Sequence, residues 1–210
     1  GHFPIGMDYK GFQKEARSEE VASRAEELRE ELGGRRIILG VDRLDYTKGL
    51  PERIRAFRNA LERYPELRGK VQLVQLAVPS RQDVEEYRTL RSEIDELVGQ
   101  VNGRFGSIGW VPIKYLLRTL PRQELLALYR IADVALVTPL KDGMNLVAKE
   151  FCACQVDEPG VLVLSEFAGA AAQLKDGAML VNPHNIEGMA DAIHGALELP
   201  VAERRRRMRK

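Results

Sequence analysis

Residues 36–51 read RIILGVDRLDYTKGLP, and this stretch decides the fold. Its first six residues (36–41) form a run rich in Ile, Leu and Val that has the length and character of a buried β-strand. A polar turn follows, and Pro51 stands where the first turn of a helix favours proline. Apolar side chains then recur at helical spacing at Ile54, Phe57, Ala60, Leu61 and Tyr64. The stretch therefore predicts a strand, a turn and a helix.

The same alternation continues along the rest of the chain. Further strands are predicted at residues 71–78, 134–139, 161–164 and 178–181, and residues 113–117 are a short segment with no type assigned. Helices are predicted at residues 12–32, 82–99, 121–132, 146–154 and 187–197, with a short helix before the last strand. Buried strands that alternate with helices imply an α/β fold, in which a parallel sheet is covered on both faces. Ligands bind such sheets at the carboxyl ends of the strands.

The length suits one domain over residues 1–210. We interpret residues 1–10 as a connector that leads into the domain, and the glycine-rich stretch 103–109 as an irregular connection. The basic residues 201–210 are interpreted as a helix cut short, with a solvated terminus as the alternative.

Composition excludes several classes of protein. The chain has 32 basic and 31 acidic residues, and six of the basic ones lie in residues 201–210 beside a single acidic one. The preceding two hundred residues are therefore net acidic, which disfavours nucleic acid as a partner. No apolar run approaches the ~18 residues that cross a bilayer, and no signal peptide opens the chain. These patterns predict a cytoplasmic protein without a membrane partner.

Cysteine and histidine usage predicts no metal site. The two cysteines, Cys152 and Cys154, are two residues apart in a predicted helix, so they point away from each other and a disulfide between them is implausible. They are interpreted as reduced, buried thiols. The three histidines, at positions 2, 184 and 194, are too scattered to form a metal cluster.

Two cations mark the turn after the first predicted strand. Arg43 and Lys48 flank the amino end of the following helix, where free N–H groups and the helix dipole attract anions. An Arg fork and a Lys point charge together suit a diphosphate. The alternative is a surface loop that happens to be basic.

A second polar group follows the strand at 134–139, in the sequence PLKDGMNLVAKE. Gly143 lets the backbone approach a ligand, while Asp142 and Glu150 are carboxylates of the type that bind paired sugar hydroxyls. Asp142 could equally be a helix cap. A third group, Ser80, Arg81 and Asp83, follows the strand at 71–78, and the residues alone favour an ordinary capped helix as its explanation.

Competing nucleotide motifs are absent. The chain contains neither the G-x-G-x-x-G of dinucleotide sites nor the G-x-x-x-x-G-K-[ST] of P-loops, which disfavours a dehydrogenase and a P-loop ATPase. The residues by themselves therefore predict a parallel α/β domain that binds a phosphorylated, hydroxyl-rich ligand.

Five long motifs resemble the trehalose-6-phosphate synthase family: GVDRLDYTKGLPERIRAF, VPSRQDVEEY, NGRFGSIGW, DVALVTPLKDGMNLVAKE and PGVLVLSEFAGAA. The resemblance runs from about residue 3 to the end of the chain. It implies a retaining, metal-independent glycosyltransferase of the GT-B arrangement, which has two Rossmann-like lobes. This chain resembles only the carboxyl-terminal lobe, which binds the nucleotide sugar.

The resemblance also implies residue roles. Arg43 and Lys48 would bind the donor diphosphate, Asp142 would hold glucose hydroxyls, and these three would be catalytic. Glu150 would bind the ribose, and Arg81 would face the phosphate of the acceptor. The donor is further expected to meet Gly143, Met144, Asn145, Leu146 and Val147, and its base to lie near Leu120 and Arg122.

The implied reaction transfers glucose from a nucleotide-glucose to glucose 6-phosphate and forms α,α-trehalose 6-phosphate, without a cofactor. The lobe by itself is expected to bind the donor and to be inactive. The alternatives are a pseudo-glycosyltransferase that joins cyclitols, a regulatory homologue without catalysis and, remotely, a dinucleotide-binding module. The donor base (uridine, adenosine or guanosine) and a homo-oligomeric state are left open.

Overall fold

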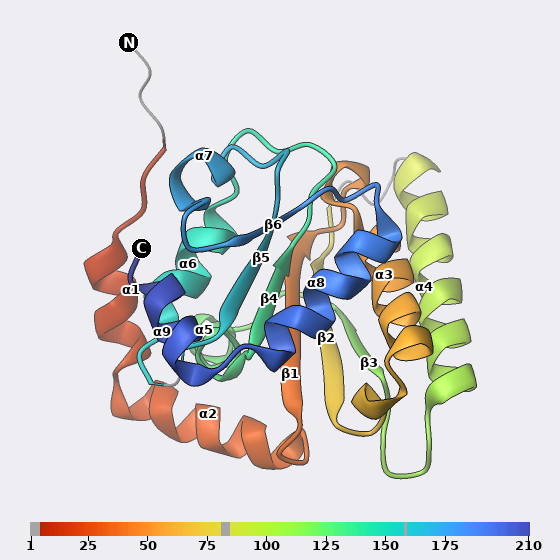
Figure 1. Cartoon of the computed structure of the whole chain (residues 1–210), viewed down its shortest axis with the longest axis horizontal. Helices are drawn as coiled ribbons and strands as arrows, with labels where there is room; N and C mark the ends of the chain where they lie inside the picture. Colours follow the sequence, from red (N-terminus) through yellow and green to blue (C-terminus); the bar gives the residue numbers. More distant parts are fainter. Residues whose placement is uncertain (1–4, 81–84, 158) are drawn as a thin grey trace.

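The computed structural model describes residues 5–80, 85–157 and 159–210. Its centre is a six-stranded sheet in the order β3-β2-β1-β4-β5-β6, in which all neighbouring strands are parallel (Figure 1). The strands are β1 (Arg36–Arg43), β2 (Val71–Val78), β3 (Ile113–Leu117), β4 (Val134–Val137), β5 (Val161–Ser165) and β6 (Met179–Val181). The strand order reverses between β1 and β4. The helices that follow these two neighbouring strands therefore lie on opposite faces of the sheet, and the place between the strands is its switch point.

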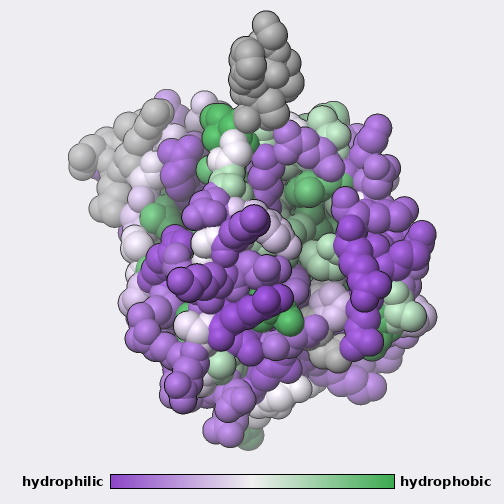
Figure 2. Space-filling model, turned by 90° about the vertical axis from the view of Figure 1, so that its left-hand side faces the viewer, coloured by the Kyte–Doolittle hydropathy of each residue, from purple (hydrophilic) through white to green (hydrophobic). Residues whose placement is uncertain are grey.

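Helices cover both faces of the sheet, as the alternation of strands and helices predicts. One face carries α1 (Tyr9–Ala16), α2 (Glu19–Glu31), α5 (Arg122–Ile131), α6 (Leu146–Cys154) and α7 (Ala171–Leu174). The other carries α3 (Leu50–Arg63), α4 (Glu85–Phe105) and α8 (Ile186–Glu198). Hydrophilic side chains dominate the outer side of the molecule on which α1 lies, as amphipathic helices around a buried sheet require (Figure 2).

Successive residues of β1 divide between the two cores. Ile37 and Leu39 belong to the core under α2 and α5, whereas Ile38 belongs to the core under α3 and α8. This division follows from the two-residue period of a strand, whose side chains alternate between the faces of the sheet. A continuous apolar run is therefore what a strand buried on both faces needs.

The prediction of one helix over residues 12–32 is wrong, because the structure has two helices there. Ser18 stands between them with an extended backbone, and its hydroxyl accepts a hydrogen bond from the N–H of Val21 at 3.3 Å. A serine in this position ends one helix and caps the next, because its side chain satisfies a free N–H group of the new first turn. The apolar spacing that predicted the helix lies in residues 21–28, which all belong to α2, so the prediction extended one helix too far toward the amino end.

Other boundaries also differ from the predictions. Helix α4 runs on to Phe105 through Gly99 and Gly103, where an irregular connection was predicted from residue 103. The buried Leu97 and Val101 anchor this end of the helix against the core, which offsets the cost of about 1 kcal/mol that glycine imposes on a helix. In the carboxyl-terminal region, α9 (Val201–Met208) is helical as predicted.

Candidate functional site

Two loops meet at the switch point of the sheet. The loop after β1 contains the short 3₁₀ turn η1 (Tyr46–Lys48), and the loop after β4 leads into α6. The carbonyl of Thr47 accepts hydrogen bonds from the N–H groups of Leu140 and Lys141, at 2.8 and 3.3 Å. The sequence therefore brings its two predicted polar groups into one place.

Gly49 makes this approach possible. Its φ is +66°, and a Cβ atom at this position would lie 2.6 Å from the carbonyl oxygen of Thr138. A side chain would therefore be strained in its backbone conformation and would also separate the loops. The glycine also precedes α3, whose first turn contains Pro51 as the sequence predicts.

The buried guanidinium of Arg53 lies beneath both loops. It donates to Asp42 Oδ2 at 2.5 Å, to Gln75 Oε1 and Thr138 Oγ1 at 3.0 Å each, and to the Lys48 carbonyl at 3.5 Å. Arg53 and Asp42 form a fully buried ion pair. Burial raises the pKa of the Asp42 carboxyl, and the charge of Arg53 opposes this rise. One side chain thus connects β1, β2, the β4 loop and the turn that carries Lys48.

A short ion pair joins the two predicted polar groups. Lys48 Nζ lies 2.6 Å from Asp142 Oδ2, and each side chain is only 14% exposed. The same oxygen accepts from Asn145 Nδ2 at 3.1 Å, and Asp142 Oδ1 accepts from the Met144 N–H at 3.3 Å. The cation predicted for a diphosphate and the carboxylate predicted for a sugar therefore contact each other directly.

The structure decides against Asp142 as the helix cap. The residue that caps α6 is Asn145, whose side chain accepts from the N–H of Ala148 at 3.2 Å. Asn145 has a φ of +72°, which turns the chain sharply into the helix. Asp142 is therefore not needed to cap the helix. Gly143 is exposed, while Leu146 and Val147 form the half-buried first turn of the helix.

Arg43 is far more accessible than Lys48. Its side chain is 60% exposed, and its guanidinium lies 3.8 Å from Asp45. Asp45 accepts from the N–H and the hydroxyl of Thr47, at 2.9 and 2.7 Å. Burial acts to raise the pKa of Asp45, but the bonds from Thr47 and the charge of Arg43 outweigh it and lower that pKa. Asp45 therefore stays charged and shapes the turn.

Glu150 lies on α6, and its partner comes from α5. Its carboxylate accepts a hydrogen bond from the buried hydroxyl of Tyr129 at 2.9 Å. Burial, followed by the charge and hydrogen bond of Glu150, raises the pKa of Tyr129 well above its usual value. Tyr129 is thus a permanent donor that orients Glu150, and no signal in the sequence connects these two residues.

A third loop, after β5, was missed by the sequence reasoning. The Gly169 N–H donates to the Asp142 carbonyl at 3.0 Å, and the Ala170 N–H donates to the Met144 carbonyl at 2.7 Å. A Cβ atom on Gly169 would lie 2.0 Å from the Gly143 carbonyl. The run of small residues in FAGAA is the signal that could have found this loop, because only small residues let two backbones pack so closely.

The remaining predicted residues are those for the acceptor phosphate and for the base. Arg81 lies outside the described residues. Leu120 is buried, and Arg122 pairs with Glu15 of α1 at 2.5 Å and covers the ring of Phe12. The contact of this stretch with a base stays a prediction.

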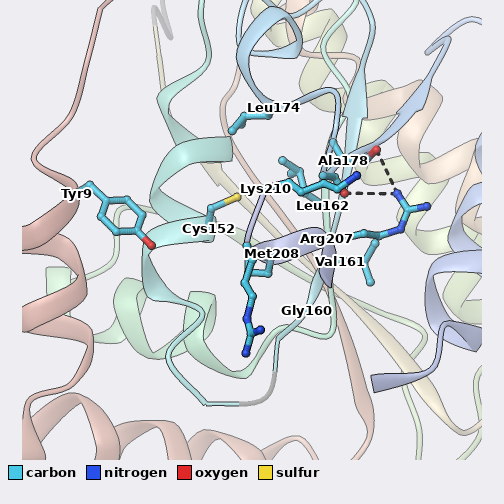
Figure 3. Close-up of a pocket in the computed structure, with 12 residues that line it drawn as sticks. Tyr9, Cys152, Gly160, Val161, Leu162, Leu174, Ala178, Arg207, Met208 and Lys210 are labelled. Atoms are coloured by element: carbon cyan, nitrogen blue, oxygen red, sulfur yellow. Dashed lines mark hydrogen bonds between the residues drawn. The ribbon is translucent and has the colours of Figure 1, made fainter. Parts of the chain in front are cut away.

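A separate cavity of about 260 Å³ contains none of the predicted site residues (Figure 3). It is lined by residues that include Tyr9, Cys152, Val161 and Met208, and it lies at the amino end of β5. Cys152 and Cys154 are free, and burial raises the pKa of each thiol to about 12, so both are protonated at neutral pH.

The described part of the chain supplies two further observations. None of its groups of His, Cys, Asp and Glu could hold a metal ion. None of its helices is both long enough and apolar enough to cross a membrane.

A parallel sheet in this strand order, with polar loops at its switch point, defines the Rossmann-like class of ligand-binding domains. The family model of glycosyltransferase family 20 matches residues 1–210, and the chain belongs to that family. Its fold is that of the carboxyl-terminal lobe of a GT-B enzyme, as the motifs predict.

Three relatives illustrate the match. A trehalose-6-phosphate synthase of Mycobacterium leprae is 53% identical over 210 residues, which are 100% of this chain and 42% of that protein. A second relative is the crystal structure of an α,α-trehalose-phosphate synthase (UDP-forming) from Burkholderia xenovorans in complex with glucose-6-phosphate. It superposes on this chain with a TM-score of 0.95 at 46% sequence identity, and the match covers 100% of this chain and 46% of that chain. An E. coli structure bound with UDP-2-fluoro glucose has a TM-score of 0.93 and 43% identity and covers 98% and 46%. The chain spans less than half the length of each.

We predict that Arg53→Met destabilises the chain by about 3–5 kcal/mol, because it leaves the Asp42 carboxylate buried without its partner. Chemical denaturation followed by circular dichroism measures the change. Arg58→Met is the matched control, since Arg58 lies on the same helix in a loose pair with Glu62 at 4.0 Å. The control should change stability by less than about 0.5 kcal/mol. Equal losses in the two variants would show that the buried network is not special.

Proposed function

We propose that this chain is the donor-binding lobe of an enzyme that transfers glucose from UDP-glucose to glucose 6-phosphate and forms α,α-trehalose 6-phosphate with retention. The observation that carries the proposal is the contact of Lys48 with Asp142 at the switch point, 2.6 Å long, in a member of glycosyltransferase family 20. Uridine is the proposed base because the Burkholderia relative is named as UDP-forming.

The geometry supports a role for each described residue of the site. Arg43 and Lys48 come from the two ends of one turn and supply positive charge for the diphosphate. Asp142 accepts from glucose hydroxyls, while the backbone from Gly143 to Asn145 lines the sugar. Glu150, oriented by Tyr129, accepts from the ribose hydroxyls. Arg81 is proposed to face the phosphate of the acceptor.

The proposed mechanism depends on fixed charge. As the nucleoside diphosphate leaves, negative charge grows on its phosphate oxygens while the sugar becomes oxocarbenium-like. Cations already held in place stabilise that charge without reorganisation, which is the effect that dominates such steps. The departing phosphate assists attack by the acceptor on the same face of the sugar, so retention needs no enzymatic nucleophile. Neither a metal nor another cofactor is part of this proposal.

We propose that the lobe is inactive alone, because a lobe that holds only the donor has no acceptor in place. A cytoplasmic location also remains a proposal. The names of the relatives do not favour the pseudo-glycosyltransferase.

The activity test compares two proteins. A protein in which this chain is joined to an amino-terminal GT-B lobe should form trehalose 6-phosphate from UDP-glucose and glucose 6-phosphate, and the 210-residue chain alone should form none. Product is measured by mass spectrometry. Turnover of cyclitol substrates with no turnover of glucose 6-phosphate would instead support the pseudo-glycosyltransferase.

Lys48→Ala and Arg43→Ala should each weaken UDP binding to the chain by about 10- to 100-fold, as the loss of a charge-assisted hydrogen bond does. Binding of uridine should not change, because uridine has no phosphate. Calorimetry with and without EDTA measures both ligands and tests independence from metal. Lys141→Ala is the control, since Lys141 is exposed in the adjoining loop. A strict requirement for magnesium would contradict the mechanism.

Glu150→Gln should weaken UDP binding by about 1.5–3 kcal/mol, as expected for hydrogen bonds to a charged group, and should leave the circular dichroism unchanged. The ligand 2′,3′-dideoxy-UDP provides the control, because it lacks the hydroxyls that Glu150 would accept from. The affinity for 2′,3′-dideoxy-UDP should be the same in wild type and in Glu150→Gln. If the affinity for UDP is also unchanged, Glu150 is merely a helix residue that accepts from Tyr129.

A further inference from the structure

Three cation–carboxylate pairs lie at the switch point, and they differ in depth. Arg53 and Asp42 are fully buried, Lys48 and Asp142 are 14% exposed, and Arg43 lies at the surface. The outermost pair is loose, with 3.8 Å between Arg43 and Asp45, so it competes little with a ligand. The middle pair is short and shielded, and it holds the cation that the proposed function assigns to the diphosphate.

A free nucleoside diphosphate must draw Lys48 away from Asp142. The carboxylate then loses a charged partner in a shielded place, and leaving such a group unpaired is costly. Its two remaining donors, Asn145 Nδ2 and the Met144 N–H, are neutral and cannot balance the charge. The buried carboxylate of Asp42 adds to this cost. The charge of Asp142 raises the pKa of Asp42, which means that the two carboxylates repel each other, and Lys48 no longer offsets this repulsion once it has moved to the ligand.

A nucleotide sugar does not leave Asp142 unpaired. Its phosphates draw Lys48 away in the same way, but its sugar hydroxyls donate to the vacated oxygens of Asp142. The carboxylate therefore exchanges one donor for others instead of losing its partner. The difference between the two ligands arises at Asp142, although the diphosphate itself is bound by cations.

We propose that the Lys48–Asp142 pair makes the site discriminate against nucleoside diphosphate in favour of nucleotide sugar. Asp142 is then a specificity-determining residue that promotes release of the spent diphosphate, because it regains Lys48 once the sugar has left. This inference rests on the proposed function, since it takes Lys48 to bind the diphosphate and Asp142 to bind the sugar.

The test is a titration of Asp142→Asn with UDP and with UDP-glucose. The amide keeps the shape of the side chain and removes its charge, so Lys48 is released to the phosphates. Affinity for UDP should rise about fivefold, while affinity for UDP-glucose should fall, so that the preference inverts. Glu93→Gln is the matched control, because it removes the carboxylate of another short ion pair, which joins Glu93 of α4 to Arg55 of α3 at 2.5 Å, and it should change UDP affinity less than twofold. A fall or no change in UDP affinity for Asp142→Asn overturns the proposal.

A double-mutant cycle separates the ion pair from simple repulsion. In a Lys48→Met background, Asp142→Asn should leave UDP affinity unchanged, because there is no pair to release. A gain in this background equal to that in wild type would mean that Asp142 merely repels phosphate, which also overturns the proposal. Failure of the proposed function looks different: the wild-type chain would then bind neither UDP nor UDP-glucose, or Lys48→Met would bind UDP as tightly as wild type.

Discussion

The buried guanidinium of Arg53 is the constraint on which the site depends. A charged group without exposure must have its donors satisfied, and its acceptors come from β1, β2, the β4 loop and the carbonyl of Lys48. Gly40 leaves room for this network, because a Cβ atom there would lie 2.3 Å from Gln75 Oε1 and 2.6 Å from the guanidinium of Arg53. Arg53 supports the main chain at Lys48 from below through a long hydrogen bond of 3.5 Å, and its own position is held by the buried pair with Asp42, which is costly to break.

Close packing of loops supplies the second constraint. Gly49 lets the β1 loop touch the β4 loop, and Gly169 lets the β5 loop touch the backbone at Gly143. The hydrogen bonds between these loops hold the main chain on both sides of Asp142. Backbone groups on such a support are fixed before a ligand arrives, so binding does not have to order them.

The sequence predicted five of the six strands, because strands buried on both faces are nearly continuous apolar runs. It also predicted that Lys48 and Asp142 lie in loops at the carboxyl ends of strands, because both follow such runs. It did not predict Arg53, since an arginine on a helix ordinarily indicates a solvated face. The side chains that accept its hydrogen bonds lie 11 to 85 residues away, and only the folded sheet brings them together. Gln75 within an apolar strand was the available signal. The Tyr129–Glu150 contact is unpredictable for the same reason, because it joins two helices through tertiary packing.

The graded burial of the three ion pairs separates stability from function. Desolvation strengthens an ion pair against exchange with solvent or ligand, so the pair between Arg53 and Asp42 cannot be broken without a large loss of stability. The surface pair at Arg43 is screened by water and gives little resistance. Only the intermediate pair, Lys48 with Asp142, is both strong enough to affect affinity and open enough to be replaced. The depth of a pair, more than its charges, therefore determines which pair can distinguish one ligand from another.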